Sequence, residues 1–367
     1  MFSTFPFSEN VEINKSTFMT TMPPTVDSSR SQQSSSEKNI LGWEGFTLTL
    51  PPYWTLASFA GDRAKGNFRI TDEDGTRIEV VWETPKGRPN LERSIENLSK
   101  AWEKEAKKKK QDFSLANNPP IVSKTRQKKE QLINFGWKGD SKDPMAAHGW
   151  GVGWHCAECG RVVVAHMVGR GRETSGTAQR LASEIFSSME CHNHGGWDTW
   201  NVFGFQVDIP ENFELKLGKL QTGKIEMEWE NPRPADWWMT PKWWGRRPER
   251  IGVQRLSAAN LVLIDQDMKT WAKRMVPRCN KKYLFTFDEH NSTDDQLWFT
   301  GKTWNLRQRL SETIWQIVLR RPRQEIRATV WRDEKDNKLL FAFFDLALQN
   351  AHVQDDVLDS MATHTLV

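Results

Sequence analysis

The chain has 367 residues, which is enough for two domains of ordinary size that each bury a core. Apolar residues are 37% of the chain and charged residues 27%, and no run of 18 apolar residues occurs, so we expect no membrane-spanning helix. The first twenty residues include Glu9 and Glu12 and lack the basic start and apolar stretch of a secretory signal, so a cytoplasmic protein is expected. Four cysteines are too few for a disulfide scaffold and, in a reducing compartment, are more typical of free thiols or metal ligands.

The chain begins with a segment of low apolar content. Residues 1–38 are rich in Ser, Thr, Pro and Gln, which predicts a disordered tail. Three short strands are predicted next, at residues 45–50, 66–71 and 77–83, and an Asp-Gly pair at 74–75 indicates a turn between the last two.

An amphipathic helix follows these strands, because apolar residues recur at spacings of four, three and four. They are Leu91, Ile95, Leu98 and Trp102. The pattern then predicts strands at about residues 121–126, 130–138, 149–156 and 161–168, and a helix that carries Leu181, Ile185 and Met189. The predicted order is three strands, a helix, four strands and a second helix.

The second half of the chain repeats this order with matching residues. The matched pairs are Arg77-Ile78 with Arg250-Ile251, Trp102 with Trp271, Gln131-Leu132 with Gln296-Leu297, residues 154–166 with 331–343, and 187–192 with 359–364. We therefore predict an α+β protein of two tandem repeats, residues 39–195 and 196–367, each an antiparallel sheet packed with about two helices.

Each repeat opens with a Gly-Phe strand that ends in a proline ahead of an aromatic residue. The residues are Gly45, Phe46, Pro51 and Trp54 in repeat 1 and Gly204, Phe205, Pro210 and Phe213 in repeat 2. This pattern resembles the PsbP-like fold shared with the Ran-release-factor family, an antiparallel sheet covered by helices. The resemblance implies a binding or assembly-assisting protein, but it carries no catalytic residues over to this chain.

Basic residues gather in two runs, at 100–110 and 123–129, within a net charge of +4. Lys107–Lys110 and Lys124–Lys129 could contact phosphates while some of the 19 tryptophans stack on unpaired bases, as in a single-stranded nucleic-acid binder. A Lys-rich helix end is more typical of a solvated face that complements the helix dipole. The common catalytic motifs GxSxG, HExxH and GxxxxGK[ST] do not occur, so an enzyme is the less favoured class.

Three cysteines of repeat 1 form the most chemically specific pattern. Cys156 and Cys159 form a Cys-x-x-Cys pair, and Cys191 with His194 repeats the same spacing. Three thiolates and one imidazole are a standard closed zinc set. In repeat 2 the positions aligned with the three cysteines hold Asp333, Asp336 and Thr363. All three cysteines of the set are therefore replaced by other residues in repeat 2.

The alternatives for these cysteines are unrelated core thiols or a redox pair. His192 is the rival fourth ligand, but its counterpart His364 is present in repeat 2, where the thiols are absent. His155 is disfavoured because neighbouring side chains of a strand point to opposite faces. We therefore predict zinc bound by Cys156, Cys159, Cys191 and His194.

Repeat 2 carries an insertion where repeat 1 has its Asp-Gly turn. The insertion covers residues 230–250 and is rich in tryptophan and arginine, the residues that dominate binding hot spots. A loop that folds back over its own sheet would hide the same rings, and both readings stay open. The predicted partner-binding residues are Trp237, Trp238, Trp243, Trp244, Arg246 and Arg247.

Together these patterns favour a non-catalytic binding or assembly protein with a protein partner and a structural zinc site in repeat 1. The alternatives are a single-stranded nucleic-acid binder and a metal- or thiol-dependent enzyme at the CAEC motif, residues 156–159.

Overall fold

The computed structural model describes residues 39–87, 89–108, 110, 112–116, 121–122, 131–139, 148–170, 173–221, 223–231, 248–279, 283–303 and 324–363. The predicted tail, residues 1–38, lies outside the described residues, as do residues 123–126 of the strand predicted at about 121–126. Ile121 and Val122, which are described, lie outside any strand. The fold is α+β, as the sequence predicts, with three antiparallel sheets and a few helices. The chain forms two compact units, one containing residues 85–187 and the other residues 40–84 and 188–367.

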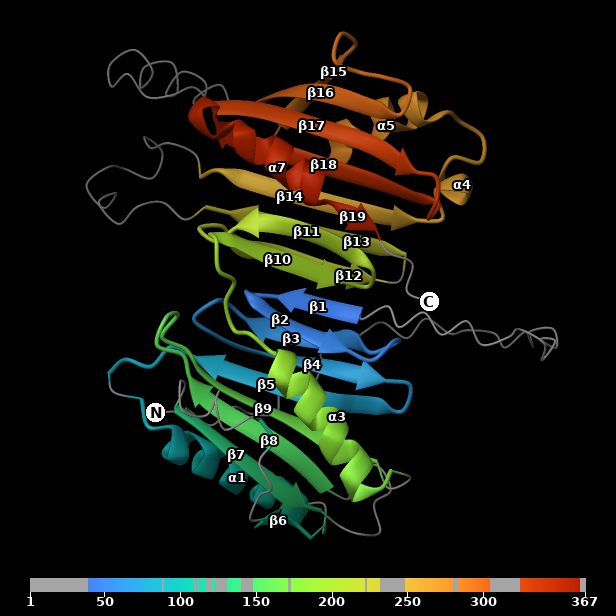
Figure 1. Cartoon of the computed structure of the whole chain (residues 1–367). Coiled ribbons are helices and arrows are strands. Elements are labelled where there is room, and N and C mark those ends of the chain that lie inside the picture. The colour runs from blue at the N-terminus through green and yellow to red at the C-terminus, as the bar shows by residue number, and fades with distance from the viewer. Residues whose placement is uncertain are drawn as a thin grey trace, which may run out of the picture. The chain divides into compact units, whose positions relative to one another are not determined.

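Two of the sheets have seven strands each (Figure 1). The first has the order β3-β4-β5-β9-β8-β7-β6, with β3 (Thr55–Gly61), β4 (Lys65–Asp72), β5 (Gly75–Glu83), β6 (Ser114–Ala116), β7 (Gln131–Lys138), β8 (His148–His155) and β9 (Val162–Gly169). The second has the order β12-β13-β14-β18-β17-β16-β15, with β12 (Glu214–Gln221), β13 (Lys224–Glu230), β14 (Arg250–Ser257), β15 (Tyr283–Asp288), β16 (Gln296–Thr303), β17 (Gln324–Asp333) and β18 (Lys338–Ala347). When strands are counted from the first of each sheet, the two orders are the same.

The third sheet has five strands in the order β19-β11-β10-β1-β2. Its strands are β1 (Asn39–Trp43), β2 (Phe46–Leu50), β10 (Trp197–Val202), β11 (Phe205–Pro210) and β19 (Ala362–Thr363). β1 and β2 are joined by Glu44-Gly45, and β10 and β11 by Phe203-Gly204. All four of these linking residues have positive φ, which is the geometry of a type I′ hairpin turn and explains the glycine in each.

In the unit of residues 85–187, α1 (Leu91–Lys108) packs against the strands that follow it. Its residues Leu91 and Ile95 form a buried cluster with Phe135, Val162 and Val164. β8 has glycine at alternate positions, and a side chain at Gly151 would meet the ring of Phe135 at 2.1 Å. The run GWGVGW, residues 149–154, therefore forms a closely packed strand within the one predicted at about 149–156. The second predicted helix is α3 (Ser175–Ser188), which buries Ala178, Ala182, Ile185 and Phe186.

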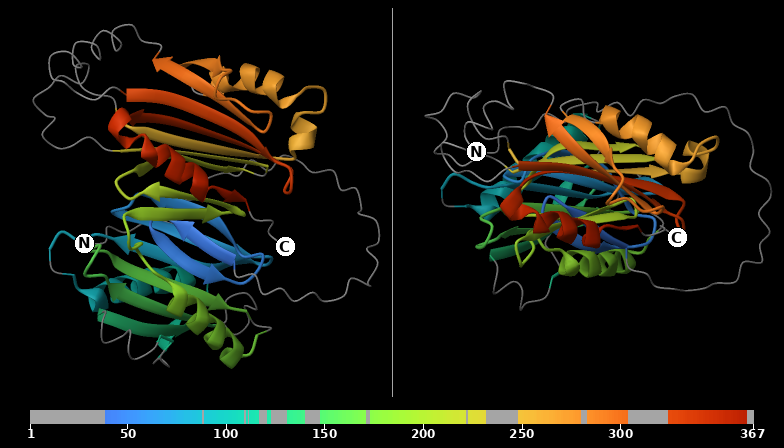
Figure 2. Two further views of the ribbon diagram at one scale, coloured as in Figure 1. Left: turned by 45° about the horizontal axis from the view of Figure 1, so that its top comes forward. Right: turned by 90° about the horizontal axis from the view of Figure 1, so that it is seen from above.

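In the other unit, α5 (Met268–Cys279) packs against the sheet that contains β15–β18 (Figure 2). Trp271 and Val276 of this helix join Phe299, Val330 and Phe341 in one buried cluster. The remaining helices are the short α4 (Ala259–Val262), the 3-10 turn η2 (Leu348–Asn350), and α7 (His352–Ser360), which packs on β11. None of the helices in the described part of the chain combines the length and apolar character needed to span a bilayer.

Candidate metal centre

The first half of the site is the turn between β8 and β9. Its backbone is closed by hydrogen bonds from Cys156 N to Arg161 O at 2.9 Å and from Gly160 N to Cys156 O at 3.0 Å. Gly160 has φ of 70°, a left-handed conformation that glycine adopts without strain. The turn presents Cys156 and Cys159 together, with Cys156 buried and Cys159 half-buried.

The sulfur of Cys156 lies in a small cradle of backbone donors. N–H groups of Cys159 and Glu158 donate hydrogen bonds to it, and these lower the pKa of the Cys156 thiol. Burial has the larger effect and raises that pKa above its ordinary value, with the neighbouring Cys159 adding to the rise. The raised pKa favours the protonated thiol, so binding of a metal ion at Cys156 would release this proton.

The second half of the site follows the end of α3. Residues 188–190 are held against β2, because Thr49 N donates to Ser188 Oγ at 3.0 Å and the backbones of Thr47 and Glu190 exchange hydrogen bonds at 3.1 and 2.9 Å. These bonds fix the position of Cys191, whose side chain is buried. The Sγ atom of Cys191 lies 3.5 Å from Nδ1 of His192.

The structure brings four of these donors into one group. One ligand atom from each of Cys156, Cys159, Cys191 and His192 lies within 4.8 Å of all the others. Tetrahedral zinc bonds of about 2.3 Å place sulfur atoms about 3.5–4 Å apart. Donors that all lie within 4.8 Å of one another are close enough to be candidate ligands of one metal ion. The structure has no disulfide bond at Cys156, Cys159 or Cys191.

His194 is not a member of this four-residue group. It lies in a second group with Glu158 and His192, and the rings of His192 and His194 are 4.9 Å apart. His194 and Glu158 are exposed, whereas His192 is half-buried. The Cys-x-x-His spacing predicts His194 as the ligand, but residues 191–196 form a bent segment in which Gly195 and Gly196 have φ of 115° and 79°. Spacing rules for strands or regular turns do not apply to such a segment.

The corresponding turn of the second half, residues 333–338, shares two features with this one. Asp336 N donates to Asp333 Oδ1 at 3.2 Å, as Cys159 N donates to the Cys156 sulfur. Asn337 takes the left-handed conformation of Gly160, with φ of 50°. Lys338 pairs with Asp336 at 2.8 Å. The turn therefore carries a local ion pair where the first half carries thiols.

No protein-family model and no curated protein matches the chain. Among solved structures, it is similar to the Ran-binding protein Mog1p of Saccharomyces cerevisiae, with 12% identity, a TM-score of 0.25 and coverage of 44% of this chain and 90% of that chain. It is also similar to the T6SS immunity protein TplEi of Pseudomonas aeruginosa in complex with an "L" peptide, with 9% identity, a TM-score of 0.28 and coverage of 89% and 98%.

The other predicted sites are placed as follows. Lys107 lies in the last turn of α1 and pairs with Glu103 at 2.7 Å, as Lys100 pairs with Glu96 at 2.6 Å. Such i, i+4 pairs are typical of a solvated helix face. The second basic run, Lys124–Lys129, lies outside the described residues. So do all six predicted partner-binding residues, Trp237, Trp238, Trp243, Trp244, Arg246 and Arg247.

Both ends of the insertion are described, however. Glu230 pairs with Arg250 across β13 and β14, and Asn231 N donates to Glu249 O at 3.0 Å. The buried carboxylate of Glu249 also accepts hydrogen bonds from Ala347 N at 2.9 Å and Asn350 Nδ2 at 2.8 Å. The two ends are therefore held together as the base of a hairpin.

Proposed function

We propose that the protein is a non-catalytic binding or assembly protein that contains a structural zinc ion held by Cys156, Cys159, Cys191 and His192. The grouping of these four donors carries the proposal. Four protein ligands complete a tetrahedron and leave no position for water or substrate, which is typical of structural rather than catalytic zinc. His192 replaces His194 as the proposed fourth ligand because His192 lies with the three thiols.

Zinc analysis of protein purified without chelator tests this proposal. We expect about one zinc per chain in the wild type and a large loss in Cys156→Ser and Cys191→Ser. Asp336→Ser is the matched control, because it removes the aligned side chain of the corresponding turn and should leave the zinc content unchanged. A wild type without zinc would overturn the zinc site, and the cysteines would then be ordinary thiols.

We further propose that the insertion at 230–250 is a partner-binding surface. Its Trp and Arg content and the closed hairpin base support this. The test replaces residues 232–248 with Asp-Gly, a two-residue turn of the kind that can close a hairpin. We expect the thermal unfolding temperature of repeat 2 to stay unchanged and the partners recovered by affinity purification to be lost. Unfolding of the repeat with partners unchanged would show that the loop is a lid.

We also propose that residues 39–195 and 196–367 are repeats of one domain. The shared strand order, the paired type I′ hairpins and the similar turns at 156–161 and 333–338 support this. We propose a PsbP-like architecture for each of the two repeats.

A nucleic-acid role is the alternative that the same preparation can test. Salt-dependent retention on single-stranded DNA would favour it. The ion pairs between Glu and Lys on α1 favour the solvated-face interpretation instead.

A further inference from the structure

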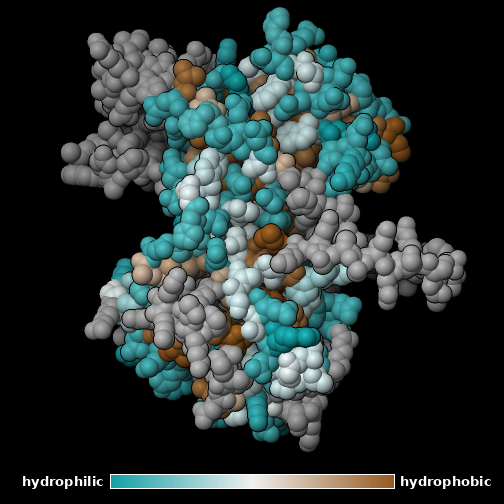
Figure 3. All heavy atoms as spheres, in the orientation of Figure 1, coloured by the Kyte–Doolittle hydropathy of each residue, from teal (hydrophilic) through white to brown (hydrophobic). Residues whose placement is uncertain are grey.

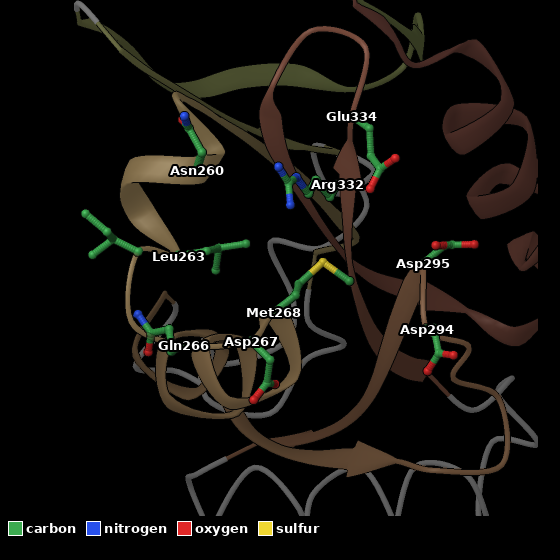
Figure 4. A pocket seen from close by; sticks show the side chains of 10 residues that line it. Asn260, Leu263, Gln266, Asp267, Met268, Asp294, Asp295, Arg332 and Glu334 are labelled. Carbon is green, nitrogen blue, oxygen red and sulfur yellow. The ribbon is translucent and has the colours of Figure 1, made fainter.

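Repeat 2 has a surface groove next to α4. Two adjoining cavities of about 460 and 620 Å³ share Asp267, Met268 and Asp294 in their lining. They lie where α4, the start of α5, the β15–β16 loop and the end of β17 meet (Figure 4). We call this surface the α4 groove.

Large apolar side chains are exposed at one side of the α4 groove. Ile264, which lines the groove, is 72% exposed, and Leu261 of the neighbouring α4 is 66% exposed. Apolar atoms show at α4 in Figure 3. Within the groove, Leu263, Met268 and Phe287 add further apolar lining. Exposed apolar residues with a polar rim are typical of binding sites rather than of ordinary surface.

The segment that exposes these residues is held in place. Ala259 N donates to Asn337 O at 2.8 Å, Asn260 N to Asn337 Oδ1 at 3.0 Å, and Asn337 Nδ2 to Asn260 Oδ1 at 2.6 Å. Ala258, just before α4, has φ of 58°, a costly conformation for a residue with a side chain. The corresponding connection of the first half, residues 84–90, contains no large apolar residue. The exposed residues are thus a fixed, local addition to the fold.

The polar lining of the groove is mostly acidic. Five carboxylates and two cations line the two cavities. The carboxylates are Asp267, Glu289, Asp294, Asp295 and Glu334, and the cations are Lys269 and Arg332. Lys269 already pairs with Glu289 at 3.7 Å and lies over the ring of Phe287. Figure 4 shows Asp294 and Asp295 on the side of the groove opposite Leu263.

From these observations we infer that the α4 groove binds a peptide segment of a partner protein in which basic residues flank a large apolar side chain. The apolar side chain would cover Leu263 and Ile264, which line the groove, and the basic residues would meet the carboxylates. This inference rests on the proposed binding function and names a surface and a class of partner for it.

The test measures fluorescence anisotropy of a labelled probe peptide, Lys-Leu-Lys-Trp-Leu-Lys-Arg, with the full-length protein. A peptide with every basic residue replaced by Glu is the charge control. We expect the basic peptide to bind and the acidic one not to bind. Asp294→Asn with Asp295→Asn should weaken binding about three- to tenfold, and Ile264→Ser about fivefold or more.

The matched control variant is Asp355→Asn with Asp356→Asn on α7, which removes the same charge from another exposed site and should bind like the wild type. The inference is overturned if the basic peptide fails to bind at about 1 mM. It is also overturned if the acidic peptide binds equally well, or if the groove and α7 variants weaken binding of the basic peptide to the same extent. Zinc content is measured on the same samples, so loss of peptide binding with full zinc rejects the groove alone. Peptide binding without zinc rejects only the zinc site.

Discussion

At the scale of single residues, the three cysteines and their histidine carry the proposed site. The sequence identifies the thiols because all three differ from their aligned positions in the second half. It does not identify the histidine, because His192 and His194 lie on a bent segment where side-chain directions follow no simple period. Burial separates them in the structure, since His192 is half-buried beside Cys191 and His194 is exposed.

The two histidines can be separated by their effect on zinc affinity. His192→Ala should weaken zinc binding about a hundredfold or more, because it removes a ligand, and His194→Ala should change it by less than about threefold. Competition with a chromophoric chelator measures both. A larger loss in His194→Ala would instead support the Cys-x-x-His ligand pair.

Gly42 occupies a place in β1 where no side chain fits. A Cβ atom there would lie 2.3 Å from Thr199 O and 2.9 Å from Asn201 N, both backbone atoms. Gly42→Ala should therefore lower the free energy of unfolding by about 2 kcal/mol or more. Gly176→Ala on α3 is the control, because a Cβ there meets nothing within 4 Å, and it should be neutral or stabilising. Equal melting temperatures for the two variants would show that β1 can shift away from β10.

At the scale of elements, long periodic segments are well predicted and edge strands are not. Strands β7, β8 and β9 begin and end within about one residue of the predicted bounds, and the helix at Leu91–Lys108 contains the whole predicted apolar face. β3 gives no such signal, because it has no apolar alternation: only Leu56 of its seven residues is buried. β1 and α4 are too short to show a period, and the α4 groove depends on residues distant in sequence.

The two type I′ hairpins allow a matched test of their equivalence. Gly45 and Gly204 have φ of 81° and 67° at the same position of their turns. Alanine at either position should cost about 1 kcal/mol of stability, because a side chain disfavours the left-handed region. Chemical denaturation of the two single variants checks this. A cost at one glycine and none at the other would argue that the two hairpins are not equivalent.

At the scale of the whole molecule, the pairing of β1 with β10 bears on the proposed duplication. Gly42 pairs with Asn201, and these residues stand at the same distance before the turn glycines Gly45 and Gly204. Antiparallel pairing of equivalent residues is what a two-fold axis through the strand pair produces. The pairing of Gly42 with Asn201 therefore supports the proposed duplication.

Removal of zinc should affect the chain locally. Chelator treatment should increase hydrogen exchange at residues 148–169 and 188–194, because the metal joins these segments, and should leave β17 and β18 unchanged. Hydrogen exchange with mass spectrometry checks this on the full chain. An equal increase in β17 and β18 would contradict a local structural role.

X-ray absorption at the zinc edge of the purified protein tests the central claim most directly, because it reports the ligands themselves. We expect three sulfur ligands at about 2.3 Å and one nitrogen ligand at about 2.0–2.1 Å. A zinc ion surrounded by oxygen and nitrogen alone, or no bound zinc, would contradict it.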